Sequence, residues 1–197
     1  LSADDAAGRA ACSTEVRQYL ELASRLAWPE APRLLITHGL SGSGKSHAAT
    51  RWLLDHTGSR ALRLRSDVER KRLFGLAPLQ TSDPMQRASL YGTQASAQTY
   101  ASLRERARAL LQAGWTVVVD AAFLRRHERD DFAGLARELG CPFGILAPQA
   151  PKEVLRQRIA ARQATGNDPS EATLEVLERQ LEWIEPLGKD EPDQTLQ

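Results

Sequence analysis

One short stretch of this sequence combines glycines, a lysine and hydroxyl residues at a spacing suited to binding phosphate. It runs Gly39-Leu-Ser-Gly-Ser-Gly-Lys-Ser46, the pattern G-x-x-x-x-G-K-[ST], between an apolar strand-like segment and a helical segment. Glycines let the backbone turn its N–H groups inward around a phosphate, at the positive end of the following helix. The residues expected to bind a nucleotide are Gly39, Ser41, Gly42, Ser43, Gly44, Lys45, Ser46 and His47.

Two side chains of this stretch have separate expected roles. The ammonium group of Lys45 is expected to reach the β- and γ-phosphates and to act in catalysis. The hydroxyl of Ser46 is expected to bind Mg²⁺, which prefers oxygen ligands and usually bridges the terminal phosphates. The motif therefore predicts ATP and Mg²⁺ as cofactors. The alternative is a glycine-rich turn with an exposed lysine.

A carboxylate follows the next apolar segment, residues 61–64. Asp67 is expected at the carboxyl edge of a sheet, where it can accept the proton of an acceptor hydroxyl, and beside the phosphate loop if the strands over 34–37 and 61–64 are neighbours. Its alternative role is the N-cap of a helix over residues 68–74. Arg70 lies one turn further on and is expected to hold an anionic or hydroxyl-rich part of the acceptor. The alternative for Arg70 is that it lies on a solvated basic face of the helix, without a role in binding.

A second carboxylate ends the apolar segment Val117-Val-Val-Asp120. Asp120 is expected to bind Mg²⁺ through water or to act as a rival base, and its alternative is to cap the following turn. Ala121 follows it where motor and transporter ATPases usually carry a glutamate, and the sequence contains no Asn-Lys pair of the kind that reads guanine. A kinase, which presents a substrate hydroxyl to the γ-phosphate, is therefore favoured over a nucleotide hydrolase.

Two arginines share one face of a helix later in the chain. Arg158 and Arg162 are four residues apart within the segment 152–162. They are expected to close over the nucleotide and neutralise the charge of the γ-phosphoryl group in the transition state. The segment 156–170 is then a lid with 163–168 as its mobile tip. The alternative is an exposed cationic helix face.

Strand-like and helical segments alternate along the chain. Short aliphatic runs predict buried strands, and apolar residues at helical spacing predict helices. The expected strands are 34–37, 61–64, 116–119 and 143–146, and the expected helices are 14–28, 46–54, 86–112, 126–139, 152–162 and 170–184, the last with Asp168 as its N-cap. Alternation implies crossover connections, so the predicted class is α/β, a three-layer P-loop NTPase fold with a mostly parallel sheet and a helical lid.

The composition narrows the class of protein further. A net charge of +1 over 197 residues argues against a general polyanion binder. No apolar run is long enough to span a membrane and no secretory signal is visible, which predicts a cytoplasmic protein without a membrane partner. Residues 1–32 are expected to form a linker before a domain over 33–197. The chain begins at Leu1 and its single methionine is Met85, which indicates a processed product or part of a longer protein.

These motifs, in this order, resemble the P-loop kinases that include zeta toxins, gluconate kinases and the kinase domain of polynucleotide kinases. In polynucleotide kinases the resemblance implies that Asp67 activates a 5′-hydroxyl and that Arg70 contacts the acceptor phosphate. The sequence is also similar to the ATP-binding half of bacterial bifunctional proteins, through segments 36–46, 120–124 and 168–172. That likeness implies fusion to an upstream aminoglycoside-phosphotransferase-like domain.

The expected function is ATP- and Mg²⁺-dependent transfer of the γ-phosphoryl group to a hydroxyl of a small molecule. One alternative is a polynucleotide 5′-hydroxyl kinase acting on a short nucleic-acid end, with candidate contacts Arg63, Arg65, Arg70, Lys71 and Arg72. The other is a non-catalytic ATP-sensing module of a larger protein. The near-neutral charge balance favours a small-molecule acceptor. Trp183, like the other tryptophans, is expected in the core or at an edge.

Overall fold

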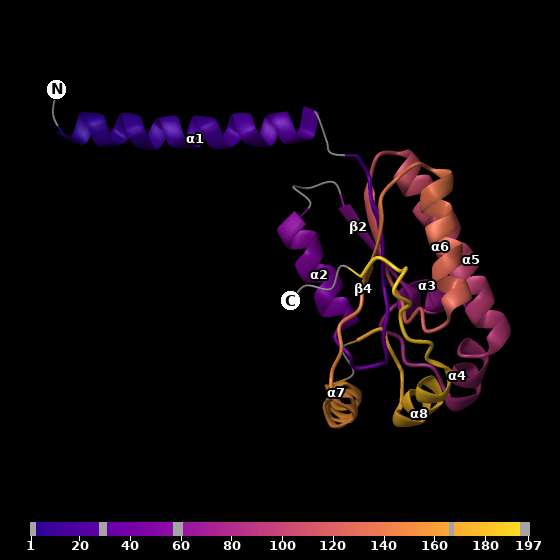
Figure 1. Cartoon of the computed structure of the whole chain (residues 1–197). Coiled ribbons are helices and arrows are strands. Elements are labelled where there is room, and N and C mark those ends of the chain that lie inside the picture. The colour runs from indigo at the N-terminus through magenta and orange to yellow at the C-terminus, as the bar shows by residue number, and fades with distance from the viewer. Residues whose placement is uncertain (1–2, 28–30, 57–60, 166–167, 194–197) are drawn as a thin grey trace.

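A four-stranded parallel sheet forms the centre of the molecule (Figure 1). The computed structural model describes residues 3–27, 31–56, 61–165 and 168–193. The strands are β1 (Leu34–Thr37), β2 (Ala61–Arg65), β3 (Thr116–Asp120) and β4 (Phe143–Leu146). Their order is β2-β3-β1-β4, and every pairing is parallel, which confirms the predicted sheet. The carboxyl ends of the strands therefore meet at one edge.

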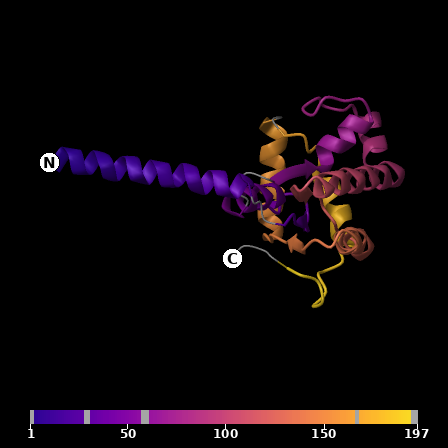
Figure 2. The same cartoon turned by 90° about the horizontal axis from the view of Figure 1, so that it is seen from above.

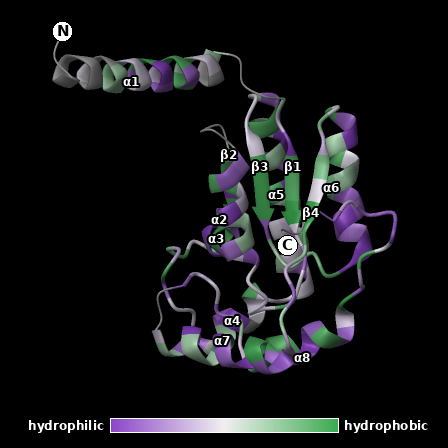
Figure 3. Cartoon of the chain, turned by 60° about the vertical axis from the view of Figure 1, so that its left-hand side comes forward, coloured by the Kyte–Doolittle hydropathy of each residue, from purple (hydrophilic) through white to green (hydrophobic). Residues whose placement is uncertain are grey.

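Helices cover both faces of the sheet and make three layers (Figures 1 and 2). Because successive strand residues point to opposite faces, the aliphatic strands supply two apolar surfaces. Helix α2 (Lys45–His56) packs on one surface through Ala49 and Trp52. Helices α5 (Thr93–Gln112) and α6 (Arg126–Glu138) pack on the other. Figure 3 shows the apolar colour concentrated on β1 and β3.

The single long helix expected over 86–112 is wrong, because the structure has two helices there. Helix α4 (Pro84–Leu90) begins with a capping box between Asp83 and Gln86, and α5 begins after Gly92 at its N-cap. The break turns the side chain of Tyr91 into the cavity described below. The shorter helix α3 (Ser66–Leu73) follows β2 directly.

Two further helices lie beyond the carboxyl edge of the sheet. Helix α7 (Lys152–Thr165) and helix α8 (Leu174–Trp183) pack together through Leu155, Ile159 and Leu177. Helix α7 extends one turn past its expected end at residue 162. The expected lid tip over 163–168 includes residues 166 and 167, which lie outside the described residues.

The expected start of the last helix at residue 170, capped by Asp168, is wrong. Helix α8 begins at Leu174, where the hydroxyl of Thr173 accepts the N–H of Val176. The Asp168 carboxylate accepts the N–H of Ser170 at 2.8 Å, which is a local turn and not a helix cap. The segment 168–173 stays out of the helix because a buried ion pair holds Glu171, as described in the Discussion.

The segment after α8 returns along the open edge of β4. Asp193 forms an isolated parallel bridge with Ile145, whose N–H donates to the carbonyl of Pro192 at 2.9 Å. Glu191 pairs with the buried guanidinium of Arg129 on α6 at 2.6 Å. The return segment is therefore joined to both the sheet and α6.

Helix α1 (Ala3–Ala27) lies apart from the other elements in both views (Figures 1 and 2). It begins earlier than the expected helix over 14–28, whose last residue lies outside the described residues. The apolar side chains of Val16, Tyr19 and Leu20 are exposed. Within the described residues, no helix has the length and apolar character needed to cross a membrane.

Candidate active site

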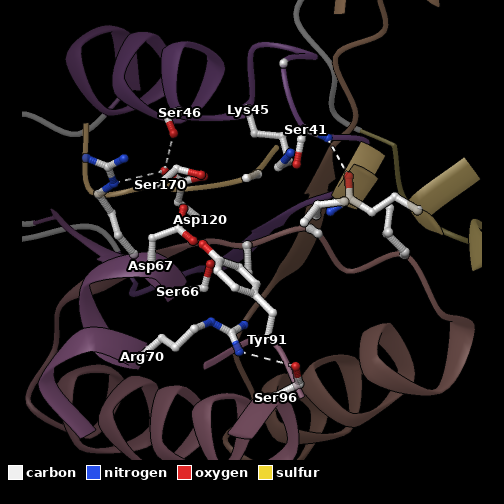
Figure 4. Close-up of a pocket in the computed structure, with 18 of the residues that line it drawn as sticks. Ser41, Lys45, Ser46, Ser66, Asp67, Arg70, Tyr91, Ser96, Asp120 and Ser170 are labelled. Carbon is white, nitrogen blue, oxygen red and sulfur yellow. Dashed lines mark hydrogen bonds and ion pairs between the residues drawn. The ribbon is translucent and has the colours of Figure 1, made fainter. Parts of the chain in front are cut away.

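A cavity of about 340 Å³ opens at the carboxyl edge of the sheet (Figure 4). Its walls come from the phosphate loop, the ends of β2 and β3, and helices α3, α5, α6, α7 and α8. The expected site residues that line it are Ser41, Gly42, Gly44, Lys45, Ser46, His47, Asp67, Arg70, Asp120, Arg158 and Arg162. In Figure 4, Asp67 lies between Lys45 and Ser46 on one side and Arg70 and Tyr91 on the other.

Two glycines of the phosphate loop adopt backbone angles that other residues avoid. The φ angle is +83° at Gly42 and +101° at Gly44. A Cβ at Gly42 would lie 2.9 Å from the carbonyl oxygen of Leu155 on α7. These glycines are therefore required by the backbone path and by the close approach of α7.

Two of the expected nucleotide-binding residues do not line the cavity. The N–H of Gly39 donates to the carbonyl of Ala122 at 3.0 Å, which ties the start of the loop to the segment after β3. The hydroxyl of Ser43 is buried without a hydrogen-bond partner in the described part of the chain. Gly39 and Ser43 therefore lie behind the surface of the loop that faces the cavity.

The side chain of Lys45 folds back over the phosphate loop. Its Nζ donates to the carbonyl of Leu40 at 2.7 Å. Burial lowers the pKa of Lys45 to about 8, and the negative charges of Asp120 and Asp67 oppose that shift. The ammonium group remains charged at neutral pH, and an anion at the loop would favour its charged form further.

Ser46 and Asp120 form an oxygen pair at the end of β3. The Ser46 hydroxyl donates to Oδ2 of Asp120 at 2.7 Å, and Nε of Arg65 lies 3.7 Å from the same oxygen. Burial raises the pKa of Asp120, against the hydrogen bond from Ser46. A hydroxyl and a carboxylate oxygen suit Mg²⁺. Among the described residues no group of three His, Cys, Asp or Glu side chains could hold a metal, so Mg²⁺ here would rely on phosphate and water ligands.

The carboxylate of Asp67 has no partner among the described residues. It lies in the first turn of α3, whose N-cap is Arg65, so Asp67 does not cap the helix. No hydrogen bond or ion pair joins its carboxylate to any described residue, although its negative charge raises the pKa of Lys45. A half-buried, unpaired carboxylate that faces a cavity is available to accept a proton.

Arg70 is buried, so the alternative that it lies on a solvated basic face of its helix is wrong. Its Nη1 donates to the carbonyl of Leu90 at 2.7 Å and to the hydroxyl of Ser96 at 3.2 Å. The guanidinium lies over the ring of Tyr91, with 5.0 Å from Cζ to the ring centroid. Nε is buried without a hydrogen-bond partner among the described residues. Arg70 is thus fixed at the cavity wall, and its Nε–H remains available to donate a hydrogen bond.

The two arginines of α7 also line the cavity. Nη1 of Arg158 donates to the carbonyl of Gly42 at 3.0 Å, and Nη2 of Arg162 donates to the carbonyl of Ala172 at 3.1 Å. Neither guanidinium forms an ion pair with a carboxylate in the described part of the chain. Two cations bound only to carbonyl groups are suited to an anionic ligand.

Several residues that line the cavity belong to no sequence motif. Tyr91 is the C-cap of α4, Tyr100 lies within α5, and Glu128 comes from the first turn of α6. Trp183 was expected in the core or at an edge, but it lines the cavity with 47% of its surface exposed. Gln180 accepts the N–H of Ser41 at 2.8 Å and joins α8 to the phosphate loop. The capping position of Glu128 is the only one of these features that local sequence could have indicated.

Comparison with known proteins identifies the family. The family model described as "AAA domain" matches residues 34–187, which includes every strand and the whole cavity. The chain belongs to this AAA domain family. No curated protein matches the sequence.

Solved structures share the fold of this AAA domain. A putative kinase from Chloroflexus aurantiacus J-10-fl has a TM-score of 0.62 at 21% identity and covers 86% of each chain. A sugar kinase from Janibacter sp. HTCC2649 has a TM-score of 0.59 at 23% identity and covers 84% of each chain. A chain of the Pnkp1/Rnl/Hen1 RNA repair complex has a TM-score of 0.57 at 20% identity, covering 77% of this chain and 43% of that one. These likenesses confirm the P-loop kinase fold.

Proposed function

We propose that this protein is an ATP- and Mg²⁺-dependent kinase that transfers the γ-phosphoryl group to a hydroxyl of a small molecule. The observation that carries the proposal is the unpaired carboxylate of Asp67, which lines the same cavity as Lys45 of the phosphate loop. The catalytic domain is the chain from residue 33 onward, and residues 1–32 are a linker. Helix α7 and the segment after it form the lid.

Asp67 acts as the general base. Its carboxylate accepts the proton of the acceptor hydroxyl, and the hydroxyl oxygen forms a bond to the γ-phosphorus. The bond between the γ-phosphorus and the oxygen bridging it to the β-phosphate breaks. The products are a phosphate monoester and ADP. Arg70, which is fixed by Leu90 and Ser96, binds the acceptor beside Asp67.

The phosphate loop and the α7 arginines bind the nucleotide. Backbone N–H groups of the loop and the ammonium of Lys45 hold the β- and γ-phosphates. Ser46 and Asp120 hold Mg²⁺, directly or through water, and the ion would neutralise charge on the terminal phosphates. Arg158 and Arg162 exchange their carbonyl partners for the transferring phosphoryl group, where charge-assisted hydrogen bonds are stronger.

The basic residues near Asp67 favour a small acceptor over nucleic acid. Lys71 pairs with Glu171 at 2.8 Å, and Arg72 pairs with Glu69 at 2.7 Å, so neither is free to bind a phosphate chain. Arg63 donates to the carbonyl of Ser46 at 3.0 Å. None of these three lines the cavity, whereas the other two candidate contacts, Arg65 and Arg70, do. One of the similar structures is a sugar kinase, which is consistent with a small-molecule acceptor.

The test is transfer of radiolabelled γ-phosphate from ATP with Mg²⁺ to a panel of sugars, sugar acids, polyols, nucleosides, aminoglycosides and 5′-hydroxyl oligonucleotides. The proposal predicts a labelled small-molecule product. Labelling of oligonucleotides alone would move the acceptor class to nucleic acid. ATP binding without any labelled product would contradict the kinase proposal and favour a nucleotide-sensing module.

A further inference from the structure

One wall of the cavity plays no part in the proposed transfer. It is formed by Tyr91, which follows α4, Tyr100 of α5 and Glu128 of the first turn of α6. These three residues line the same cavity as the phosphate loop and Asp67. Its side chains are therefore placed to contact whatever carries the reacting hydroxyl.

Glu128 is held in place through one of its two carboxylate oxygens. Oε2 accepts the N–H of Arg125 at 3.2 Å as part of the capping box of α6. Oε1 has no hydrogen-bond partner among the described residues, and no ion pair reaches the carboxylate. The guanidinium of Arg125 lies over the Trp183 ring instead, 5.6 Å from its centroid. Glu128 therefore presents one preoriented acceptor oxygen to the cavity.

The two tyrosines present hydroxyl donors to the same cavity. The Tyr100 hydroxyl accepts the N–H of Phe123 at 3.1 Å, and the Tyr91 hydroxyl accepts the N–H of Glu171 at 3.3 Å. With each oxygen accepting from the backbone, each O–H hydrogen is left to donate. Burial raises the pKa of Tyr100, and the nearby negative charges of Glu128 and Asp67 raise it further. Tyr100 thus lies close to both carboxylates.

We propose that Glu128, Tyr91 and Tyr100 form an acceptor subsite for a polyhydroxylated small molecule, a sugar or polyol, whose non-reacting hydroxyl donates to Glu128. The inference rests on the kinase proposal and names its substrate class. Each hydroxyl of a polyol can both donate and accept a hydrogen bond. It can therefore pair with a carboxylate, which accepts, and with a tyrosine hydroxyl, which donates. A phosphate oxygen cannot donate a hydrogen bond to the carboxylate of Glu128, whereas a hydroxyl can, which disfavours a nucleic-acid phosphate at this wall.

The experiment compares wild type with Glu128→Gln, because the amide oxygen of glutamine can still accept the N–H of Arg125 and keep the cap. The probes are D-glucose, D-ribose, xylitol and myo-inositol, each beside a deoxy analogue, together with D-glucosamine and a 5′-hydroxyl dinucleotide. Phosphoryl transfer is measured for each probe. Binding is measured by calorimetry with Mg²⁺ and a non-hydrolysable ATP analogue. Glu182→Gln, an exposed change beside Trp183, is the matched control.

The subsite predicts that Glu128→Gln raises the KM or Kd of the best polyol about 10- to 100-fold and leaves the KM of ATP unchanged. The deoxy analogue that lacks the contacted hydroxyl should bind weakly to wild type and show no further loss in the variant. Glu182→Gln should behave as wild type. If Glu128→Gln does not fold, Tyr91→Phe tests the same subsite by removing a donor.

The outcomes separate this inference from the kinase proposal. Transfer to a polyol with no change of acceptor KM in Glu128→Gln would overturn the subsite and leave the kinase. Polyol binding that weakens in Glu128→Gln without any transfer would support the subsite and contradict the kinase. Preference for the dinucleotide, or a selective gain for glucosamine through its amine, would overturn the assignment to polyol hydroxyls. No binding of any probe would overturn both.

Discussion

The charge of Lys45 depends on its surroundings. Burial over the phosphate loop brings its pKa to about 8, and Asp120 and Asp67 limit the shift. A lysine is cationic below its pKa, so the fraction able to attract phosphates falls as the pH rises through that value. The proposed role of Lys45 therefore has a pH signature.

Affinity for ATP is predicted to weaken as the pH rises from 7 to 9, by at most about tenfold per pH unit above the pKa. Lys45→Arg should bind with an affinity that is flat over this range, because a guanidinium stays charged. Titration with a fluorescent ATP analogue at pH 7, 8 and 9 measures both. An unchanged wild-type affinity at pH 9 would contradict the role assigned to Lys45.

Sequence reasoning at the residue scale found the side chains that sit in motifs or directly after strands. Lys45, Ser46, Asp67 and Asp120 all line the cavity, because a phosphate loop and parallel strand ends fix position through the backbone. Tyr91 and its neighbours on the acceptor wall could not be found this way. They reach the cavity through a helix break and through tertiary packing, which leave no local spacing to recognise.

A buried network joins the segment before α8 to helices α3 and α4. Glu171, in the segment before α8, pairs with Lys71 of α3 at 2.8 Å and with Arg87 of α4 at 3.3 Å. Ser82 donates to the same carboxylate through its N–H at 3.0 Å and through its hydroxyl. Although burial opposes it, these donors hold the pKa of Glu171 below its usual range. The network fixes the segment that carries Asp168 past the cavity.

Glu171→Gln is predicted to lower the free energy of unfolding by about 3–5 kcal/mol, because the Lys71 side chain, 4% exposed, loses its counter-ion. Glu178→Gln, which breaks the exposed pair with Arg156, should cost less than about 1 kcal/mol. Urea unfolding at neutral pH measures both. The difference between wild type and Glu171→Gln should shrink as the pH falls through the lowered pKa, since a protonated Glu171 no longer pairs. Equal losses in the two variants would contradict a buried role.

At the element scale, the strands were predictable because short aliphatic runs bounded by Gly, Pro or Asp are typical of parallel strands, although the edge strand β2 is only partly buried and not fully buried as expected. The helix break at Gly92 was missed, since the apolar spacing on either side continues one helical pattern. The start of α8 was misplaced for a different reason. Asp168-Pro-Ser-Glu171 has the local form of a helix start, but the buried pair with Lys71 outweighs a cap.

At the scale of the whole molecule, α1 stands outside the folded unit. The apolar side chains of Val16, Tyr19 and Leu20 are exposed, and among the described residues the core clusters contain none before Leu34. Removal of residues 1–32 is predicted to change the Tm by less than about 3 °C and the ATP affinity by less than about twofold, because no core contact is lost. Differential scanning calorimetry and nucleotide titration of the shortened chain measure this. A shortened chain that fails to unfold cooperatively would refute the domain boundary.

The central claim, that the cavity transfers phosphate to a hydroxyl with Asp67 as base, is tested most directly by Asp67→Asn. Asparagine keeps the shape of the side chain and cannot accept the proton. The rate of transfer from ATP to the best acceptor should fall about 10²- to 10⁴-fold. The Kd of ATP should stay within about threefold, and Asp131→Asn, an exposed change on α6, should alter neither. Transfer that survives in Asp67→Asn at the wild-type rate would contradict the account.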